Sequence, residues 1–344
     1  MKATMPDTHN SPILVTGAAG FIGHAVSTRL IARGETVIGI DNLNDYYDPA
    51  LKHARLANLQ DLKGFRFVEM DISDADDVKT LVRDGGVKRI IHLAAQAGVR
   101  YSIDNPFAYQ KSNLQGHLSL LEASRHAAGF QHLVYASSSS VYGDKPMGGI
   151  GFTEDEPVNE PVSLYAATKR SCELMSQSYA KLYGFPQTGL RFFTVYGPWG
   201  RPDMAYFSFT RKILAGEPIE VYGEGKMARD FTYIDDIVDG ILGALDHPPA
   251  PHSNRILNIG DSRPVGLMDM ISTLEAALGI DAKKVMRPMQ PGDVTATYAD
   301  VSRLHALTGY RPKVMLEQGL LAMVGKAERG LDTVASIKKH KSAY

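Results

Sequence analysis

The chain is poor in the features that mark secreted, membrane and nucleic-acid-binding proteins. It contains a single cysteine, Cys172, so no disulfide can form within it, and this scarcity favours a reducing compartment such as the cytoplasm. The formal net charge of −1 offers no bulk positive field to nucleic acid or an anionic membrane. No apolar run approaches the length of a membrane span, and residues 1–10 lack the apolar core of a signal peptide. We therefore expect a cytoplasmic protein with no membrane or nucleic-acid partner.

The histidines show no metal-binding pattern. Among the 11 there is no HExxH motif and no clustered ligand spacing, so we expect no metal site. With 344 residues, of which 44% are hydrophobic and 22% charged, the chain has the composition of a globular protein with one large or two ordinary domains.

A glycine-rich stretch organises the N-terminal part of the chain. Thr16-Gly17-Ala18-Ala19-Gly20-Phe21-Ile22-Gly23 separates an apolar run, residues 13–15, from a segment of helical character, residues 24–33. Strand, glycine turn and helix in this order are typical of the first βαβ unit of a dinucleotide-binding domain. We expect Gly17 to permit the tight turn, Gly20 to let the main chain approach a pyrophosphate, and Gly23 to let the helix pack close to the sheet. The helix N-terminus then attracts the phosphates.

An acidic residue ends the second apolar run, at the position that selects the cofactor. Residues 36–40 form this run, and Asp41 follows it. A carboxylate there binds the ribose hydroxyls and repels a 2′-phosphate, which favours NAD over NADP. The alternative is a glycine turn of some other α/β fold, in which Asp41 is an ordinary residue at the end of a strand.

Apolar runs and helical segments alternate along the first part of the chain. The expected strands are residues 13–15, 36–40, 65–70, 88–93, 132–136 and 187–191. The expected helices are residues 24–33, 50–59, 106–128 and 163–183. This alternation predicts an α/β fold of the Rossmann type, with a doubly wound parallel sheet. Residues 144–163, rich in Gly, Pro and acidic residues, predict a surface loop.

The composition changes after Phe192. Residues 197–202, Gly-Pro-Trp-Gly-Arg-Pro, exclude regular structure. We expect an NAD-binding Rossmann domain of residues 11–193 plus 232–265, in which a strand at 256–259 returns to the main sheet. We expect a smaller α/β substrate-binding domain of residues 194–231 plus 266–330, and a tail at 331–344.

Three side chains predict a proton-transfer site. Tyr165 and Lys169 are four residues apart on an expected helix, so they share one face, although this spacing alone is common on solvated helices. Ser138 belongs to a serine cluster that follows an expected strand, where parallel sheets bind ligands. We expect Tyr165 to act as a base, Lys169 to stabilise its phenolate, and Ser138 to hydrogen-bond the substrate hydroxyl and the phenol. A free phenol loses its proton only near pH ~10, so it needs this help.

These motifs resemble those of extended short-chain dehydrogenase/reductases, within the nucleotide-sugar epimerase/dehydratase group. The resemblance rests on TGAAGFIG, on the serine cluster before VYG and on YAATK, and it extends over about residues 12–325. Longer strings are similar to those of the 4-epimerases of UDP-glucuronate. They are NLNDYYDPALKHARL, HLAAQAGVRYS, RFFTVYGPWGRPDMA and RDFTYIDDIVDGI.

The resemblance implies an isomerase of polysaccharide biosynthesis that uses tightly held NAD. Tyr165 takes the proton of the sugar 4-hydroxyl while C4 gives a hydride to the cofactor. The 4-keto sugar turns over, with its diphosphate anchored, and receives the hydride on its other face. UDP-glucuronate then becomes UDP-galacturonate, with its carboxylate retained and no net redox change.

The resemblance also implies which residues bind NAD. Asp71 is expected to meet the adenine amino group or, alternatively, to cap the next helix. Phe193 is expected beside the nicotinamide. The full set is Gly17, Gly20, Phe21, Ile22, Gly23, Asp41, Asn42, Asp71, Ile72, Leu93, Ala94, Ala95, Gln96, Asn113, Tyr165, Lys169 and Phe193.

The serine cluster distinguishes this chain from related enzymes. The 4,6-dehydratases have Thr-Asp-Glu before VYG and the UDP-glucuronate decarboxylases have Glu, whereas this chain has Ser138, Ser139 and Ser140. A 4-keto sugar with a C5 carboxylate tends to lose CO₂, so an epimerase must hold that carboxylate in a poorly aligned position. Ser139, Ser140 and Thr194 are the expected hydroxyl donors. UDP-galactose 4-epimerases usually have Asn where this chain has Thr194, which favours the uronate.

Further residues are expected at the substrate, each with an alternative or a weaker basis. Arg229 is expected to bind a phosphate bidentately, or to form an internal salt bridge. Arg201 is expected to contact the substrate, or to form a surface ion pair, and Thr194 has a purely packing alternative. Tyr222 is expected near the uracil, and Asp293 near the ribose.

Three other functions stay open at this point. They are a 4-epimerase of UDP-glucose or UDP-N-acetylglucosamine, a UDP-glucuronate decarboxylase, and a non-catalytic NAD-binding regulator. The regulator is expected to lack Tyr165 or Lys169, and both are present. The family resemblance implies a homodimer that pairs through the helices at 106–128 and 163–183.

Overall fold

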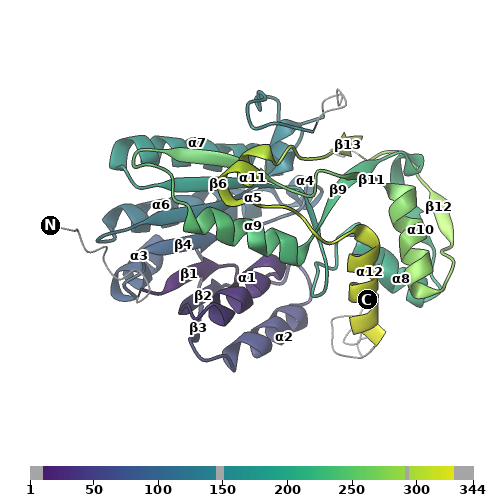
Figure 1. Cartoon of the computed structure of the whole chain (residues 1–344), viewed down its shortest axis with the longest axis horizontal. Helices are drawn as coiled ribbons and strands as arrows, with labels where there is room; N and C mark the ends of the chain where they lie inside the picture. The colour runs from purple at the N-terminus through teal and green to yellow at the C-terminus, as the bar shows by residue number, and fades with distance from the viewer. Residues whose placement is uncertain (1–10, 145–150, 291–293, 329–344) are drawn as a thin grey trace. The chain divides into compact units, whose positions relative to one another are not determined.

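The computed structural model describes residues 11–144, 151–290 and 294–328 (Figure 1). The chain divides into two compact units. The first comprises Met1–Ser137, Thr168–Leu190 and Ile241–Ile256, and the second comprises Ser138–Ala167, Arg191–Gly240 and Leu257–Tyr344. These limits fall within helices and strands, so the domain boundaries expected from the sequence stay a prediction.

The strand that leads into the glycine turn lies inside a seven-stranded sheet (Figure 1). Its strands are β1 (Ile13–Thr16), β2 (Val37–Asp41), β3 (Phe65–Glu69), β4 (Arg89–His92), β5 (His132–Ser138), β6 (Gln187–Phe192) and β10 (Asn254–Ile259), in the order β10-β6-β5-β4-β1-β2-β3. β1 pairs in parallel with β2 and β4, β2 with β3, and β4 with β5. The chain therefore builds outward from β1 in both directions, which confirms the doubly wound parallel sheet. Ligands bind such sheets where this reversal occurs, beyond the carboxyl ends of the strands.

Helices connect the strands largely as expected. They are α1 (Phe21–Ala32), α2 (Pro49–Gln60), α3 (Ala75–Asp84), α4 (Tyr101–Asp104), α7 (Leu164–Tyr183) and α9 (Ile234–Asp246). α7 ends just before Gly184, whose φ of +82° suits a glycine at a helix C-terminus.

The helix expected at 106–128 is not a single α-helix. α5 (Pro106–Tyr109) leads into a π-helical segment, η2 (Gln110–Gln115), and then into α6 (Gly116–His126). Asn113 lies in η2, and its buried amide bonds to the main chain of Gln96. The predicted helix is therefore confirmed from Pro106 to His126, and it widens where this side chain serves the neighbouring loop, as π-bulges often do at functional sites.

The core of the first unit is aliphatic. β1 and β2 are buried along their whole length, which explains why both read as continuous apolar runs. The buried cluster contains Leu14, Ile38, Ile40, Ile72, Val78, Val82, Val87, Ile90, Leu120, Leu121, Ala123, Leu133, Tyr135 and Phe185.

The second unit is built around β9 (Ala228–Tyr233). β9 pairs in parallel with β7 (Thr194–Tyr196) and β13 (Ala296–Thr297), and antiparallel with β11 (Pro264–Gly266). A separate parallel pair joins β8 (Ile219–Val221) and β12 (Lys284–Met286). The helical elements are η3 (Ser139–Tyr142), α8 (Ala205–Leu214), η4 (Tyr222–Gly225), α10 (Leu267–Leu278), α11 (Ser302–Thr308) and α12 (Leu316–Glu328).

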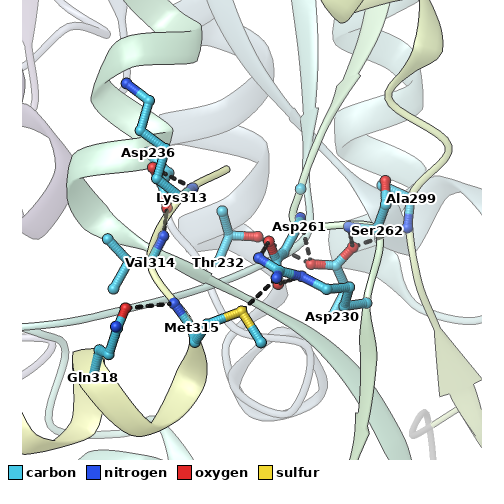
Figure 2. Close-up of polar contacts among 12 residues, drawn as sticks. Asp230, Thr232, Asp236, Asp261, Ser262, Ala299, Lys313, Val314, Met315 and Gln318 are labelled. Carbon is cyan, nitrogen blue, oxygen red and sulfur yellow. Dashed lines mark hydrogen bonds and ion pairs between the residues drawn. The ribbon is translucent and has the colours of Figure 1, made fainter. Parts of the chain in front are cut away.

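One buried carboxylate joins three segments of the second unit (Figure 2). Asp230 on β9 accepts hydrogen bonds from the hydroxyl of Thr232 and from the main-chain N–H groups of Asp261, Ser262 and Ala299. Burial raises the pKa of this carboxyl, and the hydrogen bonds oppose that shift. The carboxylate therefore fixes β9 to the turn after β10 and to the segment after β13.

The segment expected as a surface loop at 144–163 is partly buried. Phe152 is 3% exposed, stacks on Tyr142 with ring centroids 4.7 Å apart, and bridges to Ala299. Val158 is buried in the same cluster. The described residues 151–163 form no helix or strand, as predicted, but the expected surface position was wrong at Phe152 and Val158 because this burial depends on a contact with a distant part of the chain. Residues 145–150 lie outside the described residues.

Candidate active site

The glycine turn has no room for larger side chains. Gly17 has a φ of +72°, and a Cβ there would lie 2.9 Å from the main-chain nitrogen of Ala94. A Cβ on Gly20 would lie 3.0 Å from the carbonyl oxygen of Gly17, and one on Gly23 only 2.0 Å from the same oxygen. Gly23 is thus required by the turn itself, in addition to the helix packing expected from the sequence.

The N-terminus of α1 is available to an anion. Gly20 is the N-cap residue and supplies no side-chain hydrogen bond, and the first turn contains no acidic residue. Phe21 and Ile22 form that turn, with Phe21 buried beneath it. Main-chain N–H groups and the helix dipole favour phosphate at such an end. The turn and the helix end together fit a dinucleotide pyrophosphate.

A buried threonine connects the ends of β1 and β4. Thr16 Oγ1 accepts hydrogen bonds from the main-chain N–H groups of Leu93 and Ala94 at 3.2 and 3.0 Å. Burial holds the pKa of His92 well below its usual range, so the ring is neutral. The hydroxyl proton of Thr16 is then directed at Nδ1 of His92, 2.8 Å away. These hydrogen bonds thus fix the position of Thr16, the residue before the glycine turn.

Asp41 ends β2, as expected, and a lysine lies beside it. Asp41 Oδ1 accepts a hydrogen bond from Leu43 N at 2.9 Å and lies 3.7 Å from Nζ of Lys52. Lys52 Nζ also donates to Asn44 Oδ1 at 2.9 Å. Burial lowers the pKa of Lys52, and the charge of Asp41 opposes this shift. No motif in the sequence marks Lys52, which lies in the first turn of α2 after the loop that follows Asp41.

Asn42 and Asp71 lie together beyond β2 and β3. Asn42 Nδ2 donates to Asp71 Oδ2 at 3.2 Å. Burial alone would raise the pKa of Asp71, but hydrogen bonds from Ser73, Lys111 and Asn42 lower it to about 2. The N-cap of α3 is Asp74, so Asp71 holds the turn before this helix instead of capping it.

Asn113 ties the loop after β4 to α7. Its Oδ1 accepts a hydrogen bond from Gln96 N at 2.8 Å, and its Nδ2 donates to Gln96 O and to Thr168 Oγ1 at 3.1 and 3.0 Å. Ala95 lies on the same loop, and Ile72 packs against the start of α6. The buried amide of Asn113 therefore holds Gln96, whereas Thr16 holds Leu93 and Ala94 at the start of the same loop.

The expected proton-transfer residues lie on α7 and at the end of β5. Lys169 is 5% exposed and donates from Nζ to Ala136 O at 2.9 Å. Tyr165 is half-buried on the same helix. Ser138 is the last residue of β5, which extends beyond the expected strand, and its Oγ lies 3.1 Å from Oγ of Ser140. The structure thus brings Ser138 and Ser140 together and holds Lys169 against β5.

Phe193 and Thr194 lie where β6 passes into β7. Phe193 is 5% exposed and belongs to the buried cluster with Tyr142 and Phe152. Thr194 begins β7, half-buried beside β9, and Ser139 begins η3.

Two of the expected substrate residues have protein partners. Arg201 donates to both carboxylate oxygens of Asp203, at 3.1 and 2.5 Å, which is the ion-pair alternative. Tyr222 Oη donates to Glu220 at 2.8 Å. Asp293 lies outside the described residues.

Arg229 contacts the segment that follows residue 293. Its guanidinium donates to the main-chain oxygens of Ala228 and Val294, both at 2.8 Å, and of Thr295 at 3.3 Å. The adjacent carboxylate of Asp230 accepts the hydrogen bonds described above. The guanidinium of Arg229 therefore donates hydrogen bonds to oxygen acceptors beside the start of β9.

Within residues 11–144, 151–290 and 294–328, no group of three or more His, Cys, Asp or Glu side chains could hold a metal ion. None of the helices described in those ranges is long and apolar enough to cross a membrane.

Comparisons with known proteins identify the family of the chain. Residues 13–260 match the NAD dependent epimerase/dehydratase family. A probable UDP-glucuronate 4-epimerase of Rhizobium meliloti (strain 1021) is 47% identical over 328 residues, which cover 90% of this chain and 95% of the relative. The structure of UDP-glucuronic acid 4-epimerase from Bacillus cereus, in complex with UDP-glucuronic acid and NAD, matches with a TM-score of 0.86 and 36% identity, over 92% of this chain and 99% of the other. UDP-glucose 4-epimerase from Thermotoga maritima, with UDP-glucose, matches with a TM-score of 0.84 and 32% identity, over 93% and 100%.

Proposed function

The chain belongs to the NAD dependent epimerase/dehydratase family, and from this we propose that it converts UDP-glucuronate into UDP-galacturonate. The reaction inverts C4 through a transient 4-keto sugar and retains the carboxylate. The observation that carries the proposal is a glycine turn fitted to a dinucleotide in a chain that also has Tyr165 and a buried Lys169 on one helix. The relatives named for this reaction span almost the whole chain.

Tyr165 is the base that removes the proton of the sugar 4-hydroxyl and returns it after inversion. Lys169, held by the carbonyl of Ala136, stabilises the phenolate through its positive charge. Ser138 hydrogen-bonds the sugar hydroxyl and the phenol. NAD⁺, when bound, accepts the hydride from C4 and returns it to the other face of the sugar, so no net oxidation results.

Residues of the first unit are assigned to the pyrophosphate of NAD and to the adenosine beside it. The glycine turn and the N-terminus of α1 bind the pyrophosphate. Asp41 binds the ribose hydroxyls, and Asp71 lies toward the adenine. Asn113 holds Gln96 in the loop of residues 93–96. Phe193, which belongs to the second unit, is the residue assigned to the nicotinamide.

Retention of the carboxylate is the chemical demand that sets this reaction apart. The hydroxyls of Ser139, Ser140 and Thr194 hold the carboxylate of the 4-keto sugar where its C–C bond is poorly aligned with the ketone. No carboxylic acid stands among residues 138–140, where related decarboxylases and dehydratases have one. This composition disfavours both of those activities.

The nucleotide lies along the second unit in this proposal. When the nucleotide binds, the guanidinium of Arg229 releases its main-chain oxygen acceptors and donates two hydrogen bonds to a phosphate instead. Tyr222 is assigned to the uracil, and Asp293, which is outside the described residues, is assigned to the ribose. Arg201 pairs with both carboxylate oxygens of Asp203, which favours the surface ion-pair alternative.

A second candidate is a 4-epimerase of a neutral sugar such as UDP-glucose or UDP-N-acetylglucosamine. The likeness to UDP-glucose 4-epimerase from Thermotoga maritima favours it. Thr194, where UDP-galactose 4-epimerases usually have Asn, opposes it. A non-catalytic NAD-binding regulator is disfavoured because Tyr165 and Lys169 are both present.

We also propose that the protein acts as a homodimer in the cytoplasm, in polysaccharide synthesis. Leu118 on α6 and Leu174 and Leu182 on α7 are exposed by 40, 54 and 66%. Apolar side chains on the two helices expected to pair support self-association. Sedimentation equilibrium tests this, and a monomer at micromolar concentration contradicts it.

The test of function is a product assay by NMR with purified protein, UDP-glucuronate and no added reductant. We expect UDP-galacturonate without release of CO₂. A UDP-pentose contradicts carboxylate retention. Interconversion of UDP-glucose and UDP-galactose, with UDP-glucuronate untouched, establishes the second candidate instead.

A further inference from the structure

A buried carboxylate lies one turn beyond Lys169 on α7. The side chain of Glu173 is 1% exposed and accepts hydrogen bonds from Ser137 Oγ at 2.6 Å and from Arg170 Nη1 at 2.9 Å. Ser137 is itself buried. A charge buried to this extent is costly unless its partners are well placed, and charge-assisted bonds of this length are strong. No motif in the sequence indicates a role for Glu173.

The carboxylate and the lysine attach α7 to consecutive residues of β5. Lys169 Nζ donates to the carbonyl of Ala136, and Glu173 accepts from the side chain of Ser137. Both contacts lie within the first unit. Since successive strand side chains point to opposite faces, Ser137 faces Glu173 while Ser138 points away from it. The two contacts together set the register between α7 and the end of β5.

We propose that Glu173 is a positioning residue for the proton-transfer site. Through Ser137 it holds the end of β5, whose Ala136 carbonyl keeps the Lys169 ammonium where it stabilises the Tyr165 phenolate. The proposal rests on the proposed roles of Tyr165 and Lys169. Glu173 itself touches neither substrate nor cofactor. Without the contact between Glu173 and Ser137, the ammonium is displaced and the phenolate forms only at higher pH.

The other titratable groups around this contact do not change protonation between about pH 5 and 9. On α7, burial raises the pKa of Cys172 to about 11, and the guanidinium of Arg170 pairs with Glu173. On α6, burial lowers the pKa of His117 to about 3. Burial lowers the pKa of His92 on β4 well below its usual value and raises that of Tyr135 on β5. A titration seen in this range therefore belongs to none of them.

Two variants separate the position of the carboxylate from its charge. Ser137→Ala removes the hydroxyl and leaves the carboxylate, whereas Glu173→Gln removes the charge and keeps an oxygen that accepts the same bond. We expect Ser137→Ala to move the acid limb of the kcat profile upward by about one pH unit, an approximately tenfold loss on that limb, with KM little changed. We expect Glu173→Gln to leave the limb in place or move it downward, because loss of a nearby negative charge favours the phenolate.

A second readout does not depend on activity. In protein that retains NAD and is labelled with ¹³Cζ-tyrosine, Tyr165→Phe identifies the Tyr165 resonance, whose titration is followed in each variant. Ser137→Ala should move it upward, and Glu173→Gln should not. Glu122→Gln on α6, whose carboxylate pairs with Arg125, is the matched control. If Ser137→Ala does not fold, Ser137→Cys, with a weaker donor, gives the same comparison.

The outcomes are distinct. An unmoved Tyr165 titration in the Ser137 variant, or an equal upward shift in both variants, overturns the role of Glu173. A wild-type protein that epimerises no UDP-sugar, yet shows the expected shifts, overturns the proposed function and supports the positioning role.

Discussion

Thr16 donates its hydroxyl proton to Nδ1 of His92, because the main-chain N–H groups of Leu93 and Ala94 already donate to its oxygen. This single buried contact joins the end of β1, where the glycine turn begins, to the end of β4. These two strands flank the reversal of the sheet, where the cofactor is expected to lie. A neutral histidine, which carries no charge near NAD, therefore sets the position of the turn.

Thr16→Val should weaken NAD binding. The substitution keeps the shape of the side chain but leaves the half-buried N–H of Ala94 without this acceptor, at a cost of about 1–3 kcal/mol, while Leu93 keeps its bond to the main-chain oxygen of Thr16. Calorimetry of NAD binding and thermal melting measure the effect. Thr28→Val, on the exposed side of α1, is the control. Equal NAD affinity in the two variants would contradict a role for Thr16 in shaping the turn.

Tyr165→Phe should abolish turnover while NAD stays bound. Only the proton-transfer group is lost, and general base catalysis contributes roughly 10²–10⁴-fold. Initial rates with UDP-glucuronate and the NAD content of the purified protein are the measurements. Tyr183→Phe, at the far end of α7, should behave as the wild type. A Tyr165 variant with full activity would remove this residue from the mechanism.

Asp41→Ala should weaken NAD more than NADP. The carboxylate that binds the ribose and repels a 2′-phosphate is lost, while Lys52, which lies 3.7 Å from it, remains. Lys52→Met should have the opposite effect on the ratio of the two affinities. The measurement is the dissociation constants of NAD and NADP for each variant. An unchanged ratio of the two constants in both variants would show that Asp41 does not bind the ribose.

Thr194→Ala should increase leakage to a UDP-pentose. Loss of one hydroxyl lets the carboxylate of the 4-keto sugar rotate into alignment with the ketone and leave as CO₂. The ratio of UDP-pentose to UDP-galacturonate, followed by NMR, is the measurement. Thr273→Ala on α10 is the control, since its hydroxyl bonds to its own helix. A product ratio equal to that of the wild type counts against carboxylate holding by Thr194.

Asp71 should make the fold sensitive to acid. Hydrogen bonds lower its folded pKa to about 2, whereas an unfolded aspartate has a pKa of about 3.9. Its ionised form therefore stabilises the fold above about pH 4, and this contribution is lost as the pH falls toward 2. Asp71→Asn should lower the melting temperature at neutral pH and flatten its decline below pH ~4. Asp84→Asn, a change at an exposed carboxylate, should leave the curve unaltered.

Local patterns in the sequence predicted most of the strands and helices of the main sheet. The apolar runs before Gly17 and Asp41 became adjacent parallel strands, and the helix ending at Gly184 was placed within a residue. Such features depend on neighbouring residues, whose turn and strand preferences can be read directly. The family motifs then indicated Tyr165 and Lys169, and the structure adds that Lys169 is held by a main-chain carbonyl.

Contacts between distant residues were not predictable in this way. Glu173 reads as an ordinary helix residue until β5 places Ser137 against it, 36 positions earlier in the chain. Phe152 reads as part of a loop until Ala299 reaches it. The π-helical turn at Asn113 likewise depends on Gln96 and Thr168, which no local pattern associates with it. In each case a tertiary contact decided the outcome over local preference.

The carboxylate of Asp230 has a consequence for synthesis of the chain. Its main-chain donors at Asp261, Ser262 and Ala299 lie 31, 32 and 69 positions further along. In a ribosome-bound chain from which Ala299 has not yet emerged, the carboxylate of Asp230 lacks one of its hydrogen-bond donors. Burial of a carboxylate without all of its hydrogen bonds is costly. The first unit also needs residues up to 256, since its third segment is Ile241–Ile256. Both units thus become complete only late in translation, and chains truncated before Ala299 are expected to be substrates for chaperones and proteases.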